Sequence, residues 1–289
     1  MNIVARNLNF AYGRHEHVLK DINFEINEPK IYGLLGRNGA GKTSLLSIIG
    51  SFREPTSGEL LIKGEAPFEN AEVMQQVTFM YSKDFSSETE NAKSLLKDSN
   101  RYRPNFDYDY ALQLAEKFKL DLKKPLSKLS KGKQSIFNVI VALASRTPIT
   151  IFDEVYLGMD APARDLFYKE LLKEQELHPR IMILSTHLVS EMDYLFDDVL
   201  IIKDGKLLLH ESYEELLSRG VTLIGSKQAV DTFSNGKDII HHEQLGDTHS
   251  VTLYGAFGED EKQRAKQQGL QVGHSSLHDL FIQLTKEED

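Results

Sequence analysis

The 289-residue sequence contains no cysteine and no long apolar run, and it has fewer basic than acidic residues. Without cysteine the chain forms neither a disulfide nor a thiolate site, so redox chemistry at cysteine is excluded and a reducing compartment is permitted. The longest apolar run, residues 136–144, is interrupted by Asn138, whereas a membrane-spanning helix needs about 20 largely apolar residues. Residues 1–10 carry no secretory-signal pattern. We therefore expect no membrane span.

The charge balance narrows the classes of partner. The 43 acidic residues exceed the 34 basic ones and give a net charge of −9, which disfavours broad nucleic-acid binding through phosphate neutralisation and leaves only a local basic patch open. Hydrophobic residues make up 40% and charged residues 27%, as in ordinary globular proteins. The length favours one large domain with a smaller appendage.

Hydrophobic periodicity indicates alternating strands and helices, which is typical of a parallel sheet in an α/β fold. In chain order we expect an antiparallel strand pair within residues 8–26, a buried strand at 31–35, a helix at 41–50, mostly helical residues at 92–122, buried strands at 149–152 and 181–184, and a hairpin at 199–209. We place the main domain at residues 1–210, with a helical subdomain at about 84–145.

The remaining residues, 211–289, change in character and predict a small α+β accessory domain. Its expected strands are 221–224, 239–242 and 251–254, and its expected helices are 228–233, 259–267 and 276–284. No motif in this part carries recognisable chemistry. A packing or dimerisation module and a ligand-sensing module both remain open.

Residues 36–43, with the sequence GRNGAGKT, fit the complete P-loop pattern and lie between a predicted strand and a predicted helix. The glycines let backbone N–H groups turn toward phosphate oxygens, and the helix N-terminus favours negative charge. Lys42 is expected to reach the β- and γ-phosphates and Thr43 to hold Mg²⁺. A glycine-rich turn with a chance lysine is the alternative. The candidate cofactor-binding residues are Gly36, Arg37, Asn38, Gly39, Ala40, Gly41, Lys42, Thr43 and Ser44.

Asp153 and Glu154 follow the predicted strand at residues 149–152. Asp153 is expected to bind Mg²⁺, and Glu154 to orient or deprotonate the attacking water, because phosphoryl transfer mainly requires positioning and charge stabilisation. Alone, such an acidic pair is more often a solvated strand end. Ligands bind open parallel sheets at the carboxyl ends of the strands, so Gly36, Asp153 and His187 are expected to converge on one crevice.

Several further motifs accompany the P-loop: Tyr12 in FAYG, Ser130 and Gly132 in LSKGKQ, Asp160 in VYLGMD, and His187 in STH. Together they resemble the ATP-binding-cassette (ABC) ATPases over roughly residues 1–210. The resemblance implies that Tyr12 stacks on adenine, that the helix starting at Ser130 faces the γ-phosphate held by another subunit, that Asp160 belongs to the inter-subunit loop, and that His187 contacts the γ-phosphate. By themselves, Tyr12 and His187 would be read as structural residues and Ser130 as an ordinary helix cap.

The sequence departs from the family pattern at several positions. Lysines replace the first glycine and the glutamine of the signature, and Val155 replaces a proline. Where the family places a glutamine that links Mg²⁺, the water and the membrane partner, this chain offers Ser82. Ser82 is therefore the third candidate metal ligand beside Thr43 and Asp153, and the coupling to the partner is left open.

The resemblance implies an ATPase that uses ATP and Mg²⁺, forms a dimer with itself or a paralogue, and lies at the cytoplasmic face of the membrane beneath a separate transmembrane permease. The sequence of residues 152–160 and 183–188 is similar to that of Gram-positive exporters of antimicrobial or cytolytic peptides, a branch that includes the phenol-soluble-modulin exporter. A soluble ABC ATPase of repair or translation is one alternative, although no coiled-coil insertion or second cassette is visible. A P-loop kinase or nucleotide switch is another, opposed by the Ser130 helix and His187.

Overall fold

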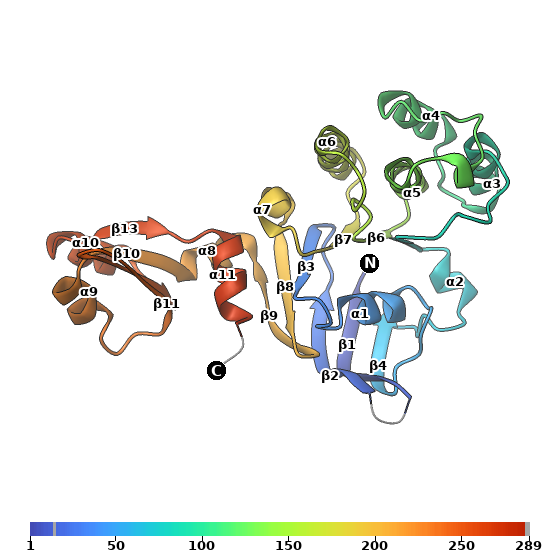
Figure 1. The fold of residues 1–289 in the computed structure, drawn as a ribbon. Coiled ribbons are helices and arrows are strands. Elements are labelled where there is room, and N and C mark those ends of the chain that lie inside the picture. Colours follow the sequence, from blue (N-terminus) through green and yellow to red (C-terminus); the bar gives the residue numbers. More distant parts are fainter. Residues whose placement is uncertain (14–15, 287–289) are drawn as a thin grey trace. The chain divides into compact units, whose positions relative to one another are not determined.

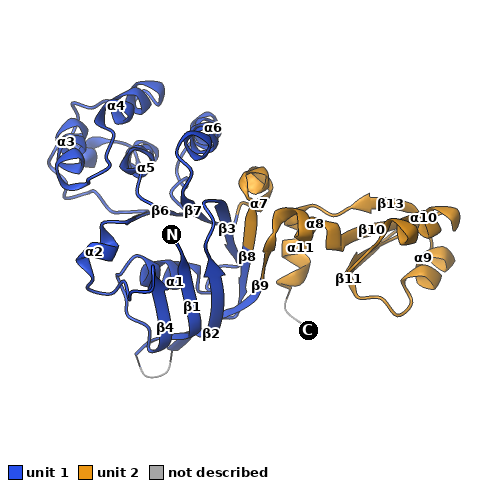
Figure 2. Cartoon of the chain, turned by 180° about the vertical axis from the view of Figure 1, so that it is seen from behind, with its two compact units in different colours: residues 1–187, 200–209 blue, residues 188–199, 210–289 orange. Residues whose placement is uncertain are grey.

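The structure, a computed structural model, describes residues 1–13 and 16–286, and it divides into two compact units (Figure 2). Unit 1 comprises Met1–His187 and Leu200–Leu209, and unit 2 comprises Leu188–Val199 and the residues from His210 onward. Within these described residues, no helix is both long and apolar enough to cross a bilayer.

The central sheet, which lies mostly in unit 1, has the strand order β5-β6-β7-β3-β8-β9 (Figure 1). β5 pairs in parallel with β6, β6 with β7, and β7 with β3. Every residue of β3, β6 and β7 is buried, as expected for parallel strands covered on both faces. The strands are β3 (Ile31–Gly36), β5 (Val77–Tyr81), β6 (Ile149–Asp153), β7 (Ile181–Thr186), β8 (Asp198–Lys203) and β9 (Lys206–Ser212).

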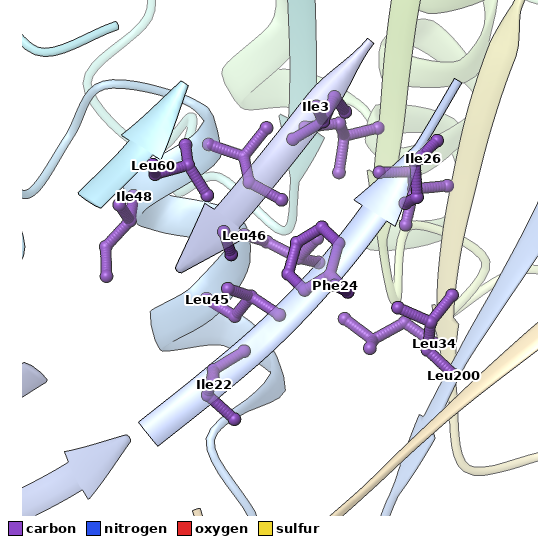
Figure 3. Close-up of a cluster of buried hydrophobic side chains, with 14 of the residues drawn as sticks. Ile3, Ile22, Phe24, Ile26, Leu34, Leu45, Leu46, Ile48, Leu60 and Leu200 are labelled. Atoms are coloured by element: carbon purple, nitrogen blue, oxygen red, sulfur yellow. The ribbon is translucent and has the colours of Figure 1, made fainter. Parts of the chain in front are cut away.

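A second, antiparallel sheet of unit 1 has the order β2-β1-β4 and is made by β1 (Ile3–Tyr12), β2 (Glu16–Ile26) and β4 (Ser57–Ile62). Its inward side chains pack around α1 (Lys42–Ile49), as Figure 3 shows for Ile22 and Leu45. This shared core fixes the start of α1 against β3 and so positions the loop between them.

The helical part of unit 1 consists of α3 (Ala92–Tyr102), α4 (Tyr108–Lys117) and α5 (Lys131–Ser145), with η1 (Leu126–Lys128) before α5. The expected helical stretch 92–122 is broken between α3 and α4, because Pro104 restricts the residue before it and Arg103 is extended, with φ −110° and ψ 117°. The side chains of α5 are buried from Gln134 to Ser145. The short α2 (Ala71–Met74) precedes β5, and α6 (Ala161–Leu177) connects β6 to β7.

A buried network of charges links α4 and the end of α5 to α6. Glu174, 1% exposed, accepts from Arg146 at 3.1 Å and from Arg180 at 3.2 Å. Glu170, one turn earlier on α6, pairs with Lys117 of α4. Buried charges are tolerated only when they are paired, so the network fixes how these helices pack.

Unit 2 is built around an antiparallel sheet with the order β11-β12-β10-β13. Strands and helices follow one another as β10, α9, β11, β12, α10 and β13, which is the ferredoxin-like βαββαβ arrangement. Val221, Val251 and Ala265 lie in its apolar core. The elements are α7 (Val189–Met192), η2 (Asp193–Leu195), α8 (Tyr213–Arg219), β10 (Gly220–Ser226), α9 (Lys227–Ser234), β11 (Ile239–Leu245), β12 (Thr248–Tyr254), α10 (Glu259–Gln267), β13 (Gln271–His274) and α11 (Leu277–Leu284).

The predicted α/β fold, with a parallel core sheet, an N-terminal antiparallel part and a small α+β C-terminal part, is confirmed. β4, β5, β13, α2, α7 and α8 were not predicted from the sequence. These elements are at most seven residues long, and such short segments show too few periods for a pattern to emerge.

Candidate active site

The loop between β3 and α1 has a backbone that only glycine accommodates at key positions. Gly39 and Gly41 have φ of 83° and 109°, in the left-handed region. A Cβ at Gly41 would lie 2.7 Å from the Leu19 side chain, and one at Gly36 would lie 2.8 Å from the carbonyl oxygen of Ile202. No side chain caps the first turn of α1 and none in that turn is acidic. Its N-terminus is therefore suited to bind an anion.

Lys42, the first residue of α1, folds back over this loop. Its Nζ donates to the carbonyl oxygen of Gly36 at 2.7 Å and to that of Arg37 at 3.3 Å. Burial lowers the pKa of Lys42, and the carboxylates of Glu154 and Asp153 oppose that shift. The loop borders a cavity of about 310 Å³ lined by Tyr12, Glu16, Val18, Asn38, Gly39, Gly41, Lys42, Thr43, Ser44 and Glu154.

Asp153 ends β6 and lies beside the loop, because β6, β7 and β3 are neighbours. In register, Asp153 pairs with Ser185, and Thr186 pairs with Leu35. Burial raises the pKa of Asp153, while the hydroxyls of Ser185 and Thr43 favour its ionised form. Its Oδ1 is buried and has no hydrogen-bond partner among the described residues. An oxygen-rich group with an unsatisfied carboxylate atom fits Mg²⁺, with Asp153 and Thr43 as the residues that would hold it.

Glu154 and His187 face each other at the carboxyl ends of β6 and β7. The His187 Nδ1 lies 2.9 Å from Glu154 Oε1, and Glu154 also lines the cavity beside Lys42. Glu154 has a φ of 51°, a strained conformation for a non-glycine residue of the kind that concentrates at functional sites. The carboxylate is therefore held where it can orient a water toward a phosphate bound by the loop.

Tyr12 ends β1 at the rim of the same cavity and is 40% exposed. Its hydroxyl lies 3.2 Å from Ser44 Oγ, and its ring meets Phe10 edge to face at 4.8 Å. The guanidinium of Arg53 lies 5.5 Å from the ring centroid. These contacts fix the plane of an exposed aromatic ring, which can then stack on a base.

Ser130, Gly132 and Asp160 do not join this group. They line a different cavity, of about 430 Å³. Ser130 Oγ accepts from the backbone N–H of Lys133 at 3.3 Å and caps α5, and Asp160 Oδ1 accepts from Ala163 at 3.0 Å and caps α6. A Cβ at Gly132 would lie only 2.4 Å from the carbonyl oxygen of Gly158. The predicted site residues thus fall into two sets within one chain.

The two lysines of the signature segment have different surroundings. The Lys133 Nζ donates to the carbonyl oxygens of Phe118 at 2.7 Å and Lys119 at 3.1 Å, just past the end of α4. Lys131 has a 75% exposed side chain whose ammonium lies 3.7 Å from Asp84. Lys133 therefore holds α4 against the start of α5, and Lys131 adds positive charge there.

Ser82 is exposed and directly follows Tyr81, which pairs with Asp153 in the sheet. It therefore lies at the same edge as the carboxylates, but it is not among the residues that line the cavity of the P-loop. Three residues near the site were not identified from the sequence. Ser185 was read only as part of the motif around His187, and Tyr156 only as part of the loop that ends at Asp160. Glu16, the first residue of β2, lines the same cavity as the P-loop. No local sequence pattern indicates that these two segments lie close together.

Comparisons with known proteins agree on one family. The family model described as "ABC transporter" matches residues 19–156. An uncharacterised ABC transporter ATP-binding protein of Methanocaldococcus jannaschii is 30% identical over 222 residues, which cover 74% of this chain and 79% of that protein. The bacitracin transport ATP-binding protein BcrA of Bacillus licheniformis is 27% identical over 303 aligned positions, which cover 98% of this chain and 96% of that protein.

Solved structures show the same fold. The ATP-binding subunit of an ABC transporter superposes with a TM-score of 0.64 at 21% identity, covering 75% of this chain and 92% of that one. A dimeric ABC cassette in a post-hydrolysis state with ADP and Pi superposes with a TM-score of 0.63 at 21% identity, covering 73% of this chain and 98% of that one. The 30% identity to an ABC transporter ATP-binding protein, together with the complete P-loop, shows that the chain binds ATP and belongs to the ATP-binding subunits of ABC transporters, a family of ATPases.

Proposed function

We propose that this chain is the ATP-hydrolysing subunit of a membrane exporter and that it works as a dimer of cassettes, with itself or a paralogue. The observation that carries the proposal is the division of the site residues into two sets. One set surrounds Lys42, and the other surrounds Ser130 at the N-terminus of α5. That N-terminus has no acidic residue in its first turn and carries Lys131 and Lys133, so it favours an anion. A second copy would place its Ser130 against the phosphates held by Lys42.

In this dimer, each residue has a role that its geometry supports. The backbone N–H groups of residues 39–43 and the Lys42 ammonium bind the phosphates. Asp153 and Thr43 would hold Mg²⁺, which neutralises charge on the phosphates when it is bound. Glu154 orients the water for attack on the γ-phosphate, and His187, 2.9 Å from it, supports that position. Asp160 and Gly132 belong to the face that meets the other cassette.

The membrane partner is a separate permease, which places the chain at the cytoplasmic face of the membrane as a peripheral subunit. A groove of about 450 Å³ in unit 1 supports a docking site, because its lining includes Phe52, Tyr81 and Tyr102. Phe52 is 55% and Tyr102 73% exposed, and exposed aromatic clusters are typical of protein interfaces. The groove begins beside Ser82, where β5 ends.

Antimicrobial or cytolytic peptides, or drugs, are the transported class that we propose. The match to a bacitracin transport protein supports it, because that match covers 98% of the chain and so includes unit 2. Direction and substrate class depend on the permease, so the partner is the first thing to identify.

The test is affinity capture of the tagged chain from detergent-solubilised membranes of its own organism. We expect one integral membrane protein to co-purify and its capture to fall with Phe52→Ser. Leu177→Ser is the matched control, because Leu177 is 58% exposed but does not line the groove. Recovery of the chain without any integral membrane protein, or with ribosomes or nucleic acid instead, would contradict the exporter assignment.

A further inference from the structure

Tyr156 is a buried residue beside the catalytic pair that does not itself line the nucleotide cavity. It is 2% exposed, and its hydroxyl lies 2.7 Å from Thr186 Oγ1. Thr186 is the last residue of β7 and directly precedes His187. The contact therefore ties the Tyr156 side chain to the end of β7, next to His187.

This contact lies at the end of the β6–β7 ladder, where backbone pairing no longer joins the segments that carry Glu154 and His187. The parallel ladder between β6 and β7 pairs Asp153 with Ser185. One residue further, the Glu154 N–H is 3.4 Å from the Ser185 oxygen, longer than the usual 2.7–3.2 Å of an N–H···O bond. Beyond that weak bond, the Tyr156 hydroxyl ties the segment that carries Glu154 to Thr186, the last residue of β7 before His187.

We propose that Tyr156 is a positioning residue of the ATPase, which acts by holding the His187 imidazole at hydrogen-bond distance from the Glu154 carboxylate. The inference rests on the proposed roles of Glu154 and His187. Tyr156 does not touch nucleotide. Its contribution is to keep two side chains, carried on two strands, at the 2.9 Å separation that the structure shows.

The chemistry of the side chain suits a permanent link. Burial raises the pKa of Tyr156 to about 12, so the hydroxyl stays protonated throughout the physiological range. As a protonated hydroxyl it can donate to Thr186 Oγ1 or accept from it. A phenylalanine would fill nearly the same volume but would leave the Thr186 hydroxyl without this partner.

The loop that contains Tyr156 has other anchors, so loss of one hydroxyl should leave it folded. Ser135 Oγ donates to the carbonyl oxygen of Leu157 at 2.9 Å, and Gly158 packs tightly against Gly132 of α5. The effect of a Tyr156→Phe substitution is therefore expected in catalysis before it is expected in folding.

The experiment compares the steady-state ATPase kinetics of Tyr156→Phe, Thr186→Val and the double variant. We expect each single variant to lower kcat about 10- to 100-fold, the scale of a small misplacement of catalytic groups, and to leave the KM for ATP within about twofold. Since both variants break the same link, the double variant should lose no more than either single one. Thr186→Ser, which retains the hydroxyl, should keep most of the activity.

Tyr32→Phe is the control, because Tyr32 is equally buried at 2% and donates to the Glu28 carbonyl oxygen at the amino end of β3, away from the site. A kcat for Tyr156→Phe equal to that of Tyr32→Phe, or additive losses in the double variant, would overturn the inference. A Glu154→Gln variant, assayed in parallel, separates a failure of the positioning role of Tyr156 from a failure of the proposed function. If it abolishes turnover while Tyr156→Phe does not lower it, only the positioning role fails, whereas persistent turnover in Glu154→Gln means that the proposed function itself fails.

Discussion

Replacing Gly132 by alanine tests the contact between the start of α5 and the loop at residues 154–160. A Cβ there would lie 2.4 Å from the carbonyl oxygen of Gly158, about 1 Å inside ordinary van der Waals contact. Because that oxygen is backbone, no rotamer change can relieve the overlap, and the N-terminus of α5 must move by about that distance. Overpacking of this kind costs about 1–3 kcal/mol. Alanine recovers up to about 1 kcal/mol through its higher helix propensity.

The expected outcome is therefore a modest loss of stability and a large loss of activity. A net cost of about 0–2 kcal/mol lowers the melting temperature by no more than about 8 °C. A shift of Ser130 by about 1 Å costs on the order of 100-fold in turnover if that residue contacts the phosphates of the other copy. Gly273→Ala is the control, since the nearest atom to its Cβ would lie at an ordinary 3.8 Å. The reasoning is refuted if calorimetry and ATPase assays of Gly132→Ala match those of Gly273→Ala.

Two further predictions follow from the charges of unit 1. Burial lowers the pKa of Lys42 below its ordinary 10.5. Because only the charged ammonium attracts phosphate, the affinity for ATP should fall as the pH rises through the alkaline range, before pH 10.5 is reached. Titration calorimetry from pH 7 to 10 measures this affinity, and a constant value would refute the prediction. Glu174→Ala leaves Arg180, 5% exposed, without its buried carboxylate and should destabilise the chain by about 3–5 kcal/mol. Denaturant unfolding measures this loss. Asp165→Ala is the control, because it removes the carboxylate of an exposed ion pair with Lys169 on the same helix.

Much of the nucleotide half of the site could be predicted because its residues follow buried strands. Asp153 and His187 stand directly after apolar segments, and parallel strands bring their carboxyl ends to one edge of a sheet. The complete P-loop pattern needs no tertiary information, because the glycines at 39 and 41 are set by the local backbone.

Other features depend on contacts between distant segments and could not be read from the sequence. The link from Tyr156 to Thr186 joins residues 30 positions apart, and the role of Gly132 becomes visible only when Gly158 packs against it. The charged residues of the α6 network, such as Glu174, look like an exposed helix face in the sequence and are buried in the structure. Periodicity reports which face is apolar, and it carries no information about which charges pair inside.

The central claim is that a γ-phosphate is bound by the P-loop of one copy and by the Ser130 end of α5 from another. The most direct measurement is the molar mass of Glu154→Gln by light scattering, with and without saturating ATP and Mg²⁺. We predict a monomer without nucleotide, a dimer with it, and a monomer in both conditions once Ser130→Ala is added. A Glu154→Gln protein that binds ATP and stays monomeric, or a dimer that persists with Ser130→Ala, would contradict the account.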